Sequence, residues 1–178
     1  MRRAFALCAA LALSGCGLTP LYSGGGAGPV AQTLHSVEVA PIGGGRAGWL
    51  VRTALQDRLG STPGEPSRYR LVVLLDDSIV GFGVRRDDSE TRERRTLRAR
   101  YQLVEADKGT VVLDATAGSD VGIDVVSSDY ANVAAEQTAL ERLSKIVADQ
   151  IVTRIALYVR RGGPATSAAS PATGSSVR

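Results

Sequence analysis

Four arginines are spaced so that they would form one row along an extended strand: Arg92, Arg94, Arg98 and Arg100. Side chains alternate across a strand, so these four share one face, with neighbours about 7 Å or 14 Å apart. The positive charges of neighbouring guanidinium groups repel one another, so we expect anions close to them. Two readings follow from the residues alone. The anions are carboxylates of this chain, on neighbouring strands or at Asp87, Glu90 and Glu93, or they belong to a phosphate- or carboxylate-bearing ligand that guanidinium groups hold by paired hydrogen bonds.

Other residues with chemical potential do not assemble into a catalytic pattern. His35 is the only histidine and has no recognisable nucleophile motif around it, which favours a structural or exposed role. The adjacent carboxylates Asp76-Asp77 and Asp87-Asp88 would face opposite sides of a strand, and we expect them to end strands or flank turns. The glycine run at 43–45 lacks the Lys-Ser/Thr of a phosphate loop. The sequence therefore predicts no enzyme, no metal site and no cofactor.

Cys16 follows a segment with the features of a secretion signal. Arg2 and Arg3 form a positive start, and an apolar stretch over residues 4–13 is too short to span a bilayer as a helix. The segment ends in Leu-Ser-Gly-Cys, which resembles the lipobox of bacterial lipoproteins, whose cysteine thiol takes a diacylglyceryl group before cleavage. An ordinary signal peptide with an incidental cysteine is the alternative. With a lipobox, Cys16 is the lipidated N-terminus of the mature chain, held on a membrane by its acyl chains.

Composition and charge divide the 178 residues into four parts. Residues 1–15 are the expected signal peptide, 16–32 a lipidated start and Gly-rich tether, 33–161 the folded domain, and 162–178 a tail rich in Gly, Pro, Ala, Ser and Thr. Removing the signal takes away two arginines and no acid, so the net charge falls from +3 to +1. Together with the secretion signal and the absence of aromatics among the arginines, this disfavours nucleic-acid binding.

The sequence of residues 33–161 predicts an α+β two-layer sandwich, in which an about four-stranded, mostly antiparallel sheet has two helices on one face. The strands expected at 35–40, 69–75 and 79–84, 91–105 and 110–117 are rich in β-branched and apolar residues, and a turn is predicted at 107–109. Apolar residues recur at helical spacing over 46–59 and 129–159. The element order is therefore β-α-β-β-β-α, and the apolar positions alternating with the arginines, Leu97, Ala99, Tyr101 and Leu103, should lie on the helices.

Several of these stretches together resemble the LPS-assembly lipoprotein (LptE) family, and alphaproteobacterial members in particular. They are Gly-Cys-Gly-Leu-Thr-Pro-Leu-Tyr at 15–22, Val-Glu-Val-Ala-Pro-Ile at 37–42, the arginine strand with its Asp-Lys-Gly turn, and Tyr-Ala at 130–131. Leu18 stands where the family commonly has Phe. The resemblance covers the chain up to about Arg161.

The resemblance implies a non-enzymatic lipoprotein of the outer membrane. Its partners would be the large β-barrel that inserts lipopolysaccharide, which the domain plugs from within the lumen or from the periplasm, lipopolysaccharide itself, and the outer membrane through the N-terminal lipid. Strand alternation alone nominates Arg92, Arg94, Arg98 and Arg100 as lipopolysaccharide contacts. The alternatives are an auxiliary periplasmic lipoprotein of a lipid-transporting ABC system and a secreted hydrolase with an unfamiliar site.

Overall fold

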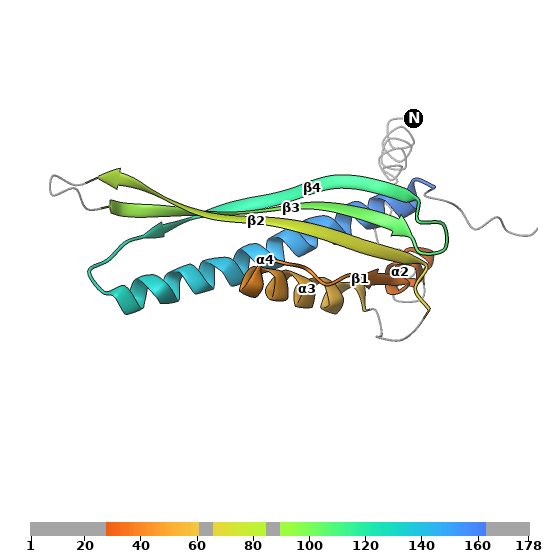
Figure 1. Cartoon of the computed structure of the whole chain (residues 1–178), viewed down its shortest axis with the longest axis horizontal. Helices are drawn as coiled ribbons and strands as arrows, with labels where there is room; N and C mark the ends of the chain where they lie inside the picture. Colours follow the sequence, from red (N-terminus) through yellow and green to blue (C-terminus); the bar gives the residue numbers. More distant parts are fainter. Residues whose placement is uncertain (1–27, 61–65, 85–89, 163–178) are drawn as a thin grey trace, which may run out of the picture.

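The computed structural model describes residues 28–60, 66–84 and 90–162. It is an elongated two-layer α+β domain in which a long twisted sheet lies over helices on one face (Figure 1). The strands are β1 (Val37–Val39), β2 (Tyr69–Val84), β3 (Glu90–Glu105) and β4 (Val111–Asp124), in that spatial order. Only β1 and β2 are parallel; the other pairs are antiparallel. The predicted fold class is confirmed.

Two helices cover the inner face of the sheet, which is the side toward the helices. Helix α3 (Gly45–Leu59) connects β1 to β2 and underlies the end of the sheet that contains β1, and the long helix α4 (Asp129–Arg160) packs beneath β3 and β4 (Figure 1). The predicted turn at 107–109 connects β3 to β4, with Gly109 at φ +66. Ser128 caps α4 by accepting a hydrogen bond from the Ala131 amide at 3.4 Å.

The core lies between the sheet and these two helices. On β3, every second residue from Leu97 to Leu103 is at most 1% exposed, as the alternation predicted. These side chains meet the buried stripes of the helices, which recur at three- and four-residue steps. The stripes consist of Val51, Leu55 and Leu59 on α3 and Leu143, Val147, Ile151 and Ile155 on α4.

The structure corrects three expectations about elements. Asp76-Asp77 does not interrupt the second strand, because β2 pairs with β3 in one unbroken register from Tyr69 to Val84. The fourth strand does not stop near residue 117, since Gly118 and Gly122 lie within β4 opposite Arg98 and Arg94. A short helix, α2 (Pro29–His35), begins within the stretch expected to be tether, and its Leu34 is buried in the core.

Candidate ligand-binding surface

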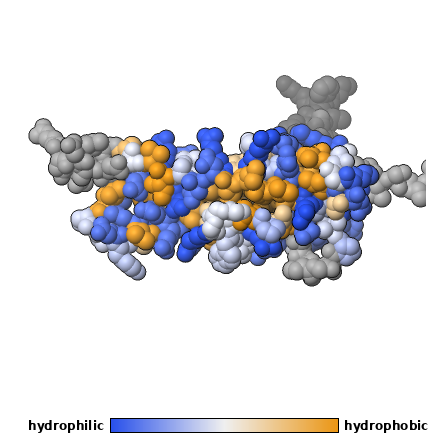
Figure 2. Space-filling model, in the orientation of Figure 1, coloured by the Kyte–Doolittle hydropathy of each residue, from blue (hydrophilic) through white to orange (hydrophobic). Residues whose placement is uncertain are grey.

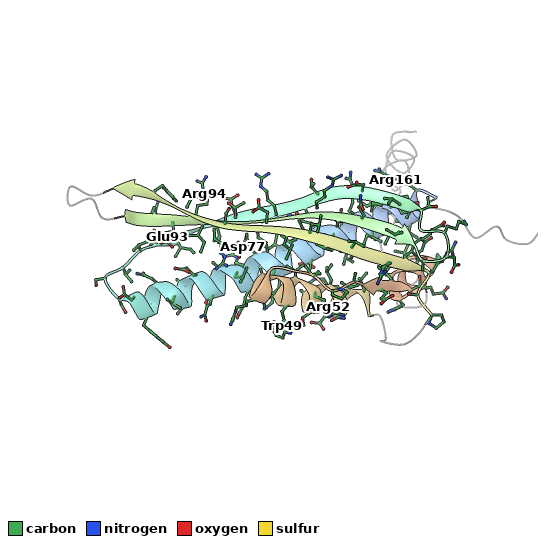
Figure 3. The ribbon with its side chains drawn as sticks, viewed as in Figure 1. Trp49, Arg52, Asp77, Glu93, Arg94 and Arg161 are labelled. Carbon is green, nitrogen blue, oxygen red and sulfur yellow. The ribbon has the colours of Figure 1, made fainter. Side chains whose placement is uncertain are left out.

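The four predicted arginines lie together on the outer face of the sheet, the side away from the helices. They come from alternate positions of β3, and all four are exposed. Figure 3 shows Arg94 pointing away from the helices, whereas Glu93 lies on the helix side of the same strand. We call Arg92, Arg94, Arg98 and Arg100 the arginine row. Of the carboxylates considered as its partners, Glu93 is therefore on the wrong face, and Asp87 lies outside the described residues.

Three members of the arginine row have carboxylate partners on β4. Arg92 Nε lies 2.9 Å from Asp124 Oδ1, Arg94 Nε 3.7 Å from Asp120 Oδ2, and Arg100 Nη2 3.1 Å from Asp114 Oδ2. The antiparallel register of β3 and β4 places these acids beside the arginines.

Hydrogen bonding between Arg100 and Asp114 shifts the pKa of both groups. The hydrogen bonds to Asp114 raise the pKa of Arg100 and lower the pKa of the carboxyl, with help from Gln102, whose side-chain amide donates to Asp114 at 2.8 Å. Both side chains are exposed, so solvent screens their attraction and the pair mainly neutralises charge. For these three arginines, the reading with intramolecular partners is the better one.

Arg98 differs from the other three. Among the described residues, no carboxylate oxygen lies within ion-pair distance of its guanidinium. Its β4 neighbour is Gly118, where an added Cβ would come 3.3 Å from Arg98 Cγ, so the glycine leaves room for the arginine stem. Arg98 is therefore the arginine whose charge stays available to a ligand.

A shallow hollow of about 670 Å³ surrounds Arg98. It crosses the sheet from β2 to the outer edge of β4, and its lining includes Leu74, Asp76, Thr96, Arg98, Arg100 and Gln150. Asp76 stands in register opposite Arg98 but makes no ion pair with it. The hollow thus offers a guanidinium that makes no ion pair among the described residues, hydroxyl and amide groups and an exposed leucine, and its lining also includes the carboxylates of Asp76 and Asp120.

The β2 part of the outer face is largely apolar, with Asp76 and Ser78 between its apolar residues. Val72, Leu74, Val80 and Phe82 are 36%, 67%, 62% and 38% exposed, and Arg94 lies 5.3 Å from the centroid of the Phe82 ring. Figure 2 shows hydrophobic residues in patches along the side of the molecule on which β2 runs. The outer face therefore has an acidic edge on β4, the arginine row in the middle, and an apolar strip on β2. This combination suits an amphiphile with an anionic head group.

The inner face contains polar residues that the sequence did not single out. Arg95 lies on this side of β3 and pairs with Asp77 at 2.6 Å, and Figure 3 shows Asp77 directed toward α4. Oε2 of Glu93 is buried without a hydrogen-bond partner. The only sequence signal for this cluster was that Arg95 falls on the apolar side of the alternation.

The remaining candidate residues have structural roles or lie outside the described part. The Nδ1–H of His35 donates to the Gly60 carbonyl oxygen at 3.1 Å, which ties the end of α2 to the end of α3. Within residues 28–60, 66–84 and 90–162 there is no group of three or more potential metal ligands, and no helix is long and apolar enough to cross a membrane. Cys16 and Asp87-Asp88 lie outside the described residues.

Comparison with known proteins identifies relatives of the chain. Residues 32–155 match the LptE family, described as lipopolysaccharide-assembly. No curated protein sequence matches significantly.

Solved structures also match the chain. A Caulobacter crescentus structure described as a candidate lipoprotein is 26% identical with a TM-score of 0.62, covering 74% of this chain and 96% of that one. Rare lipoprotein B of Shewanella oneidensis is 8% identical with a TM-score of 0.55, over 70% and 96%. A minor lipoprotein of Acinetobacter baumannii is 14% identical with the same TM-score, over 70% and 93%. The last two show likeness of fold alone.

Proposed function

Because the chain belongs to the LptE lipopolysaccharide-assembly family, we propose that it binds and plugs the β-barrel that inserts lipopolysaccharide, and assists barrel assembly and lipopolysaccharide delivery. Membership of a non-enzymatic lipoprotein family gives the chain a role in lipopolysaccharide assembly. The barrel, the plug and the delivery step are our proposal. A narrow domain with one charged face suits a polar barrel lumen.

We further propose that Cys16 carries the lipid that holds the chain on the outer membrane. The support is its place in the Leu-Ser-Gly-Cys sequence at the end of a signal-like segment. Replacing the thiol with a hydroxyl in Cys16→Ser removes the lipid acceptor. Mass spectrometry of the variant from cells should then find no acyl mass, and acyl mass on the variant would refute the assignment.

The observation that carries lipopolysaccharide binding is that Arg98, beside exposed apolar residues, makes no ion pair with any residue that the structure describes. Lipopolysaccharide is an amphiphile with anionic groups on its head and acyl chains behind them. A guanidinium with no internal carboxylate offers its fork to one such anion without first breaking an ion pair. The apolar strip on β2 lies next to the row and offers a place for acyl chains. We therefore assign the first contact to Arg98 and a secondary role to Arg92, Arg94 and Arg100.

This assignment is tested by comparing Arg98→Ala with Arg92→Ala, a matched control from the same strand and face. Binding of purified lipopolysaccharide to the full chain should weaken about tenfold with Arg98→Ala, as expected for one charge-assisted hydrogen-bonding group. Arg92→Ala should weaken lipopolysaccharide binding by less than about threefold, because Arg92 is already paired with Asp124 at 2.9 Å. Arg98→Lys should recover part of the loss, since it restores the charge without the fork. Equal effects of the two alanine variants would refute Arg98 as the first contact.

The barrel partnership is tested by a mild-detergent pull-down of the tagged full chain from its native envelope. Mass spectrometry should find one large β-barrel protein in stoichiometric amount. Recovery of ABC-transporter subunits in its place would favour the auxiliary-lipoprotein alternative and refute the plug. Turnover of an envelope substrate that disappears on replacing His35 would favour the hydrolase alternative.

A further inference from the structure

The two sides of β2 are paired very differently. On one side β2 pairs with β3 from Tyr69 to Val84. On the other, pairing with β1 stops at Leu71, whose carbonyl oxygen accepts the last hydrogen bond from the Ala40 amide at 3.0 Å. In the part of the chain that the structure describes, no strand follows on that side, and Figure 1 shows β2 continuing well past β1 toward its Val84 end. The strand therefore has a long open edge.

The backbone groups that face this open edge can be identified. The Leu71 carbonyl points toward β1, whereas the Arg68 carbonyl accepts from Ala106 on the β3 side. In a strand, the N–H and C=O of one residue point the same way, and successive residues alternate. Because the β2–β3 register has no shift, the odd-numbered residues of β2 present both groups to the open edge, and the even-numbered residues bond to β3. With respect to residues 28–60, 66–84 and 90–162, the backbone donors and acceptors of Asp77, Ile79 and Gly81 thus have no partner.

The opposite edge of the sheet is protected. On β4, the Gln150 side chain from α4 accepts from the Gly118 amide at 3.0 Å and donates to the Gly118 carbonyl at 3.3 Å, as a neighbouring strand would. Among the described residues, nothing covers the β2 edge in this way, and between residues 74 and 82 the edge carries no Lys or Pro, its only charges being those of Asp76 and Asp77. Its apolar residues Ile79, Val80 and Phe82 are 40%, 62% and 38% exposed. Soluble proteins guard edges of this kind, since an unguarded apolar edge invites pairing with another strand.

We propose that the open edge of β2, residues 76–82, binds an extended segment of a partner protein by β-strand addition. Backbone hydrogen bonds to Asp77, Ile79 and Gly81 would supply affinity, and the outward side chains of the even-numbered residues would supply selectivity. Leu74, Val80 and Phe82 call for apolar partners. Asp76 is exposed and has no ion pair among the described residues, so it calls for a basic residue between them.

The same charge pattern disfavours a second copy of this chain as the occupant. Between residues 72 and 84 the described strand has no basic residue, so a paired β2 would bring Asp76 no cation from that stretch. Arg70 lies where β1 already occupies the edge. The backbone contacts of this proposal do not involve the arginine row, but Leu74, Val80 and Phe82 belong to the apolar strip proposed above for acyl chains, so a strand on this edge and acyl chains would use the same side chains.

The test uses the full chain in mild detergent and a short synthetic peptide in which valines alternate with threonines around a central lysine. A second peptide has glutamate in place of the lysine. The lysine peptide should bind better than the glutamate peptide. It should also slow hydrogen exchange at the Asp77, Ile79 and Gly81 amides, which exchange fast in the free chain, while the Ser78 and Val80 amides are slow throughout. If the Asp77, Ile79 and Gly81 amides still exchange fast with peptide bound, strand addition is refuted.

Two matched variants separate the backbone from the side chain. Ile79→Pro removes an amide that faces the open edge and leaves the ladder to β3 intact, a placement that edge strands tolerate. It should weaken binding of the lysine peptide about tenfold, and Ile79→Ala, which keeps the amide, should stay within about threefold. Circular dichroism confirms that each variant is folded. Equal binding by both variants would refute the assignment of the edge.

A third variant keeps the proposal testable if Ile79→Pro does not fold. Asp76→Lys should reverse the preference between the two peptides, and an unchanged preference would refute the role of Asp76. Three further results would overturn the proposal: binding of neither peptide, protection of the three amides in the free chain, and a dimer in sedimentation experiments that Ile79→Ala leaves intact and Ile79→Pro dissociates. The last would establish a second copy as the occupant.

Discussion

Arg95 and Asp77 are joined diagonally across β3 and β2 on the helix side of the sheet. Nε and Nη2 of Arg95 donate to the two carboxylate oxygens of Asp77 at 2.9 and 2.6 Å. A third hydrogen bond, from Nη1 to the Glu136 carbonyl oxygen at 3.0 Å, reaches α4. The hydrogen bonds with Asp77 raise the pKa of Arg95 more than its burial lowers it. At this end of the domain, an ion pair takes part in holding helix and sheet together.

Arg95→Ala should lower the free energy of unfolding by about 1–3 kcal/mol. The change leaves the Asp77 carboxylate without its partner in a site where the pair is only 12% and 24% exposed. Urea unfolding of the full chain measures the loss. The matched control is Arg92→Ala on the outer face, where the pair with Asp124 is 2.9 Å long but 62% and 76% exposed. We expect less than about 0.5 kcal/mol there, because water screens the pair. Equal losses in the two variants would show that burial does not distinguish them.

The sequence predicted the elements whose pattern repeats. Alternation along β3 and the helical spacing of Val147, Ile151 and Ile155 on α4 are local properties, and both were confirmed. The continuity of β2 was not predictable in this way. Asp77 looks like a strand breaker until Arg95, on the next strand, is seen to neutralise it. The glycines of β4 made the predicted strand too short for a related reason. Gly118 lies within the strand because its missing side chain leaves room for the stem of Arg98 on the next strand.

The candidate site was predictable only as a group. Alternation placed the arginine row on one face, but the sequence could not separate Arg98 from its neighbours. That distinction depends on the β3–β4 register, which puts Gly118 opposite Arg98 and carboxylates beside the other three arginines. A one-residue error in register would move every carboxylate of β4 to the other face, so local patterns do not resolve it. The open edge of β2 is likewise a property of the sheet order.

Gln150→Leu should expose the edge of β4. The variant keeps the size of the side chain but removes the two hydrogen bonds to Gly118, so the free energy of unfolding should fall by about 1 kcal/mol. The free energy of unfolding of Gln150→Glu should lie between that of the unsubstituted chain and that of Gln150→Leu. A carboxylate still accepts a hydrogen bond from the Gly118 amide but cannot donate one to its carbonyl oxygen. Urea unfolding measures stability, and light scattering measures association through the freed edge, which we expect to increase. No change in either quantity for the leucine variant would mean that Gln150 does not protect the edge.

Gly48→Ala should destabilise the domain, although alanine is the better helix former by about 1 kcal/mol. Gly48 is buried in the first turn of α3, and an added Cβ would lie 2.4 Å from the Gly43 carbonyl oxygen and 2.6 Å from that of Ile42. Both atoms are backbone, so α3 would have to shift away from the preceding loop. We expect a net loss of about 1–2 kcal/mol in urea unfolding, where overpacking exceeds the gain in helix propensity. An increase in stability would contradict the close approach.

Asp149→Asn should reduce the loss of stability in acid. Hydrogen bonds from Arg58 hold the pKa of Asp149 below its ordinary 3.8, an effect that burial partly opposes and the Arg58 charge reinforces. The folded state therefore releases this proton at lower pH than the unfolded chain does. The ionised group contributes stability above about pH 4, and the contribution disappears as the pH falls through the folded pKa.

Urea unfolding between about pH 5 and pH 2 should show a shallower decline for Asp149→Asn than for the unsubstituted chain. At neutral pH the variant should be somewhat less stable, because Arg58 keeps its hydrogen bond to the Ala54 carbonyl oxygen but loses its anionic partner. Asp107→Asn, in the exposed turn between β3 and β4, is the control and should leave the slope unchanged. If both variants decline in parallel with the unsubstituted chain, the Arg58–Asp149 pair, which joins α3 to α4, does not contribute to acid sensitivity, and other carboxylates must account for it.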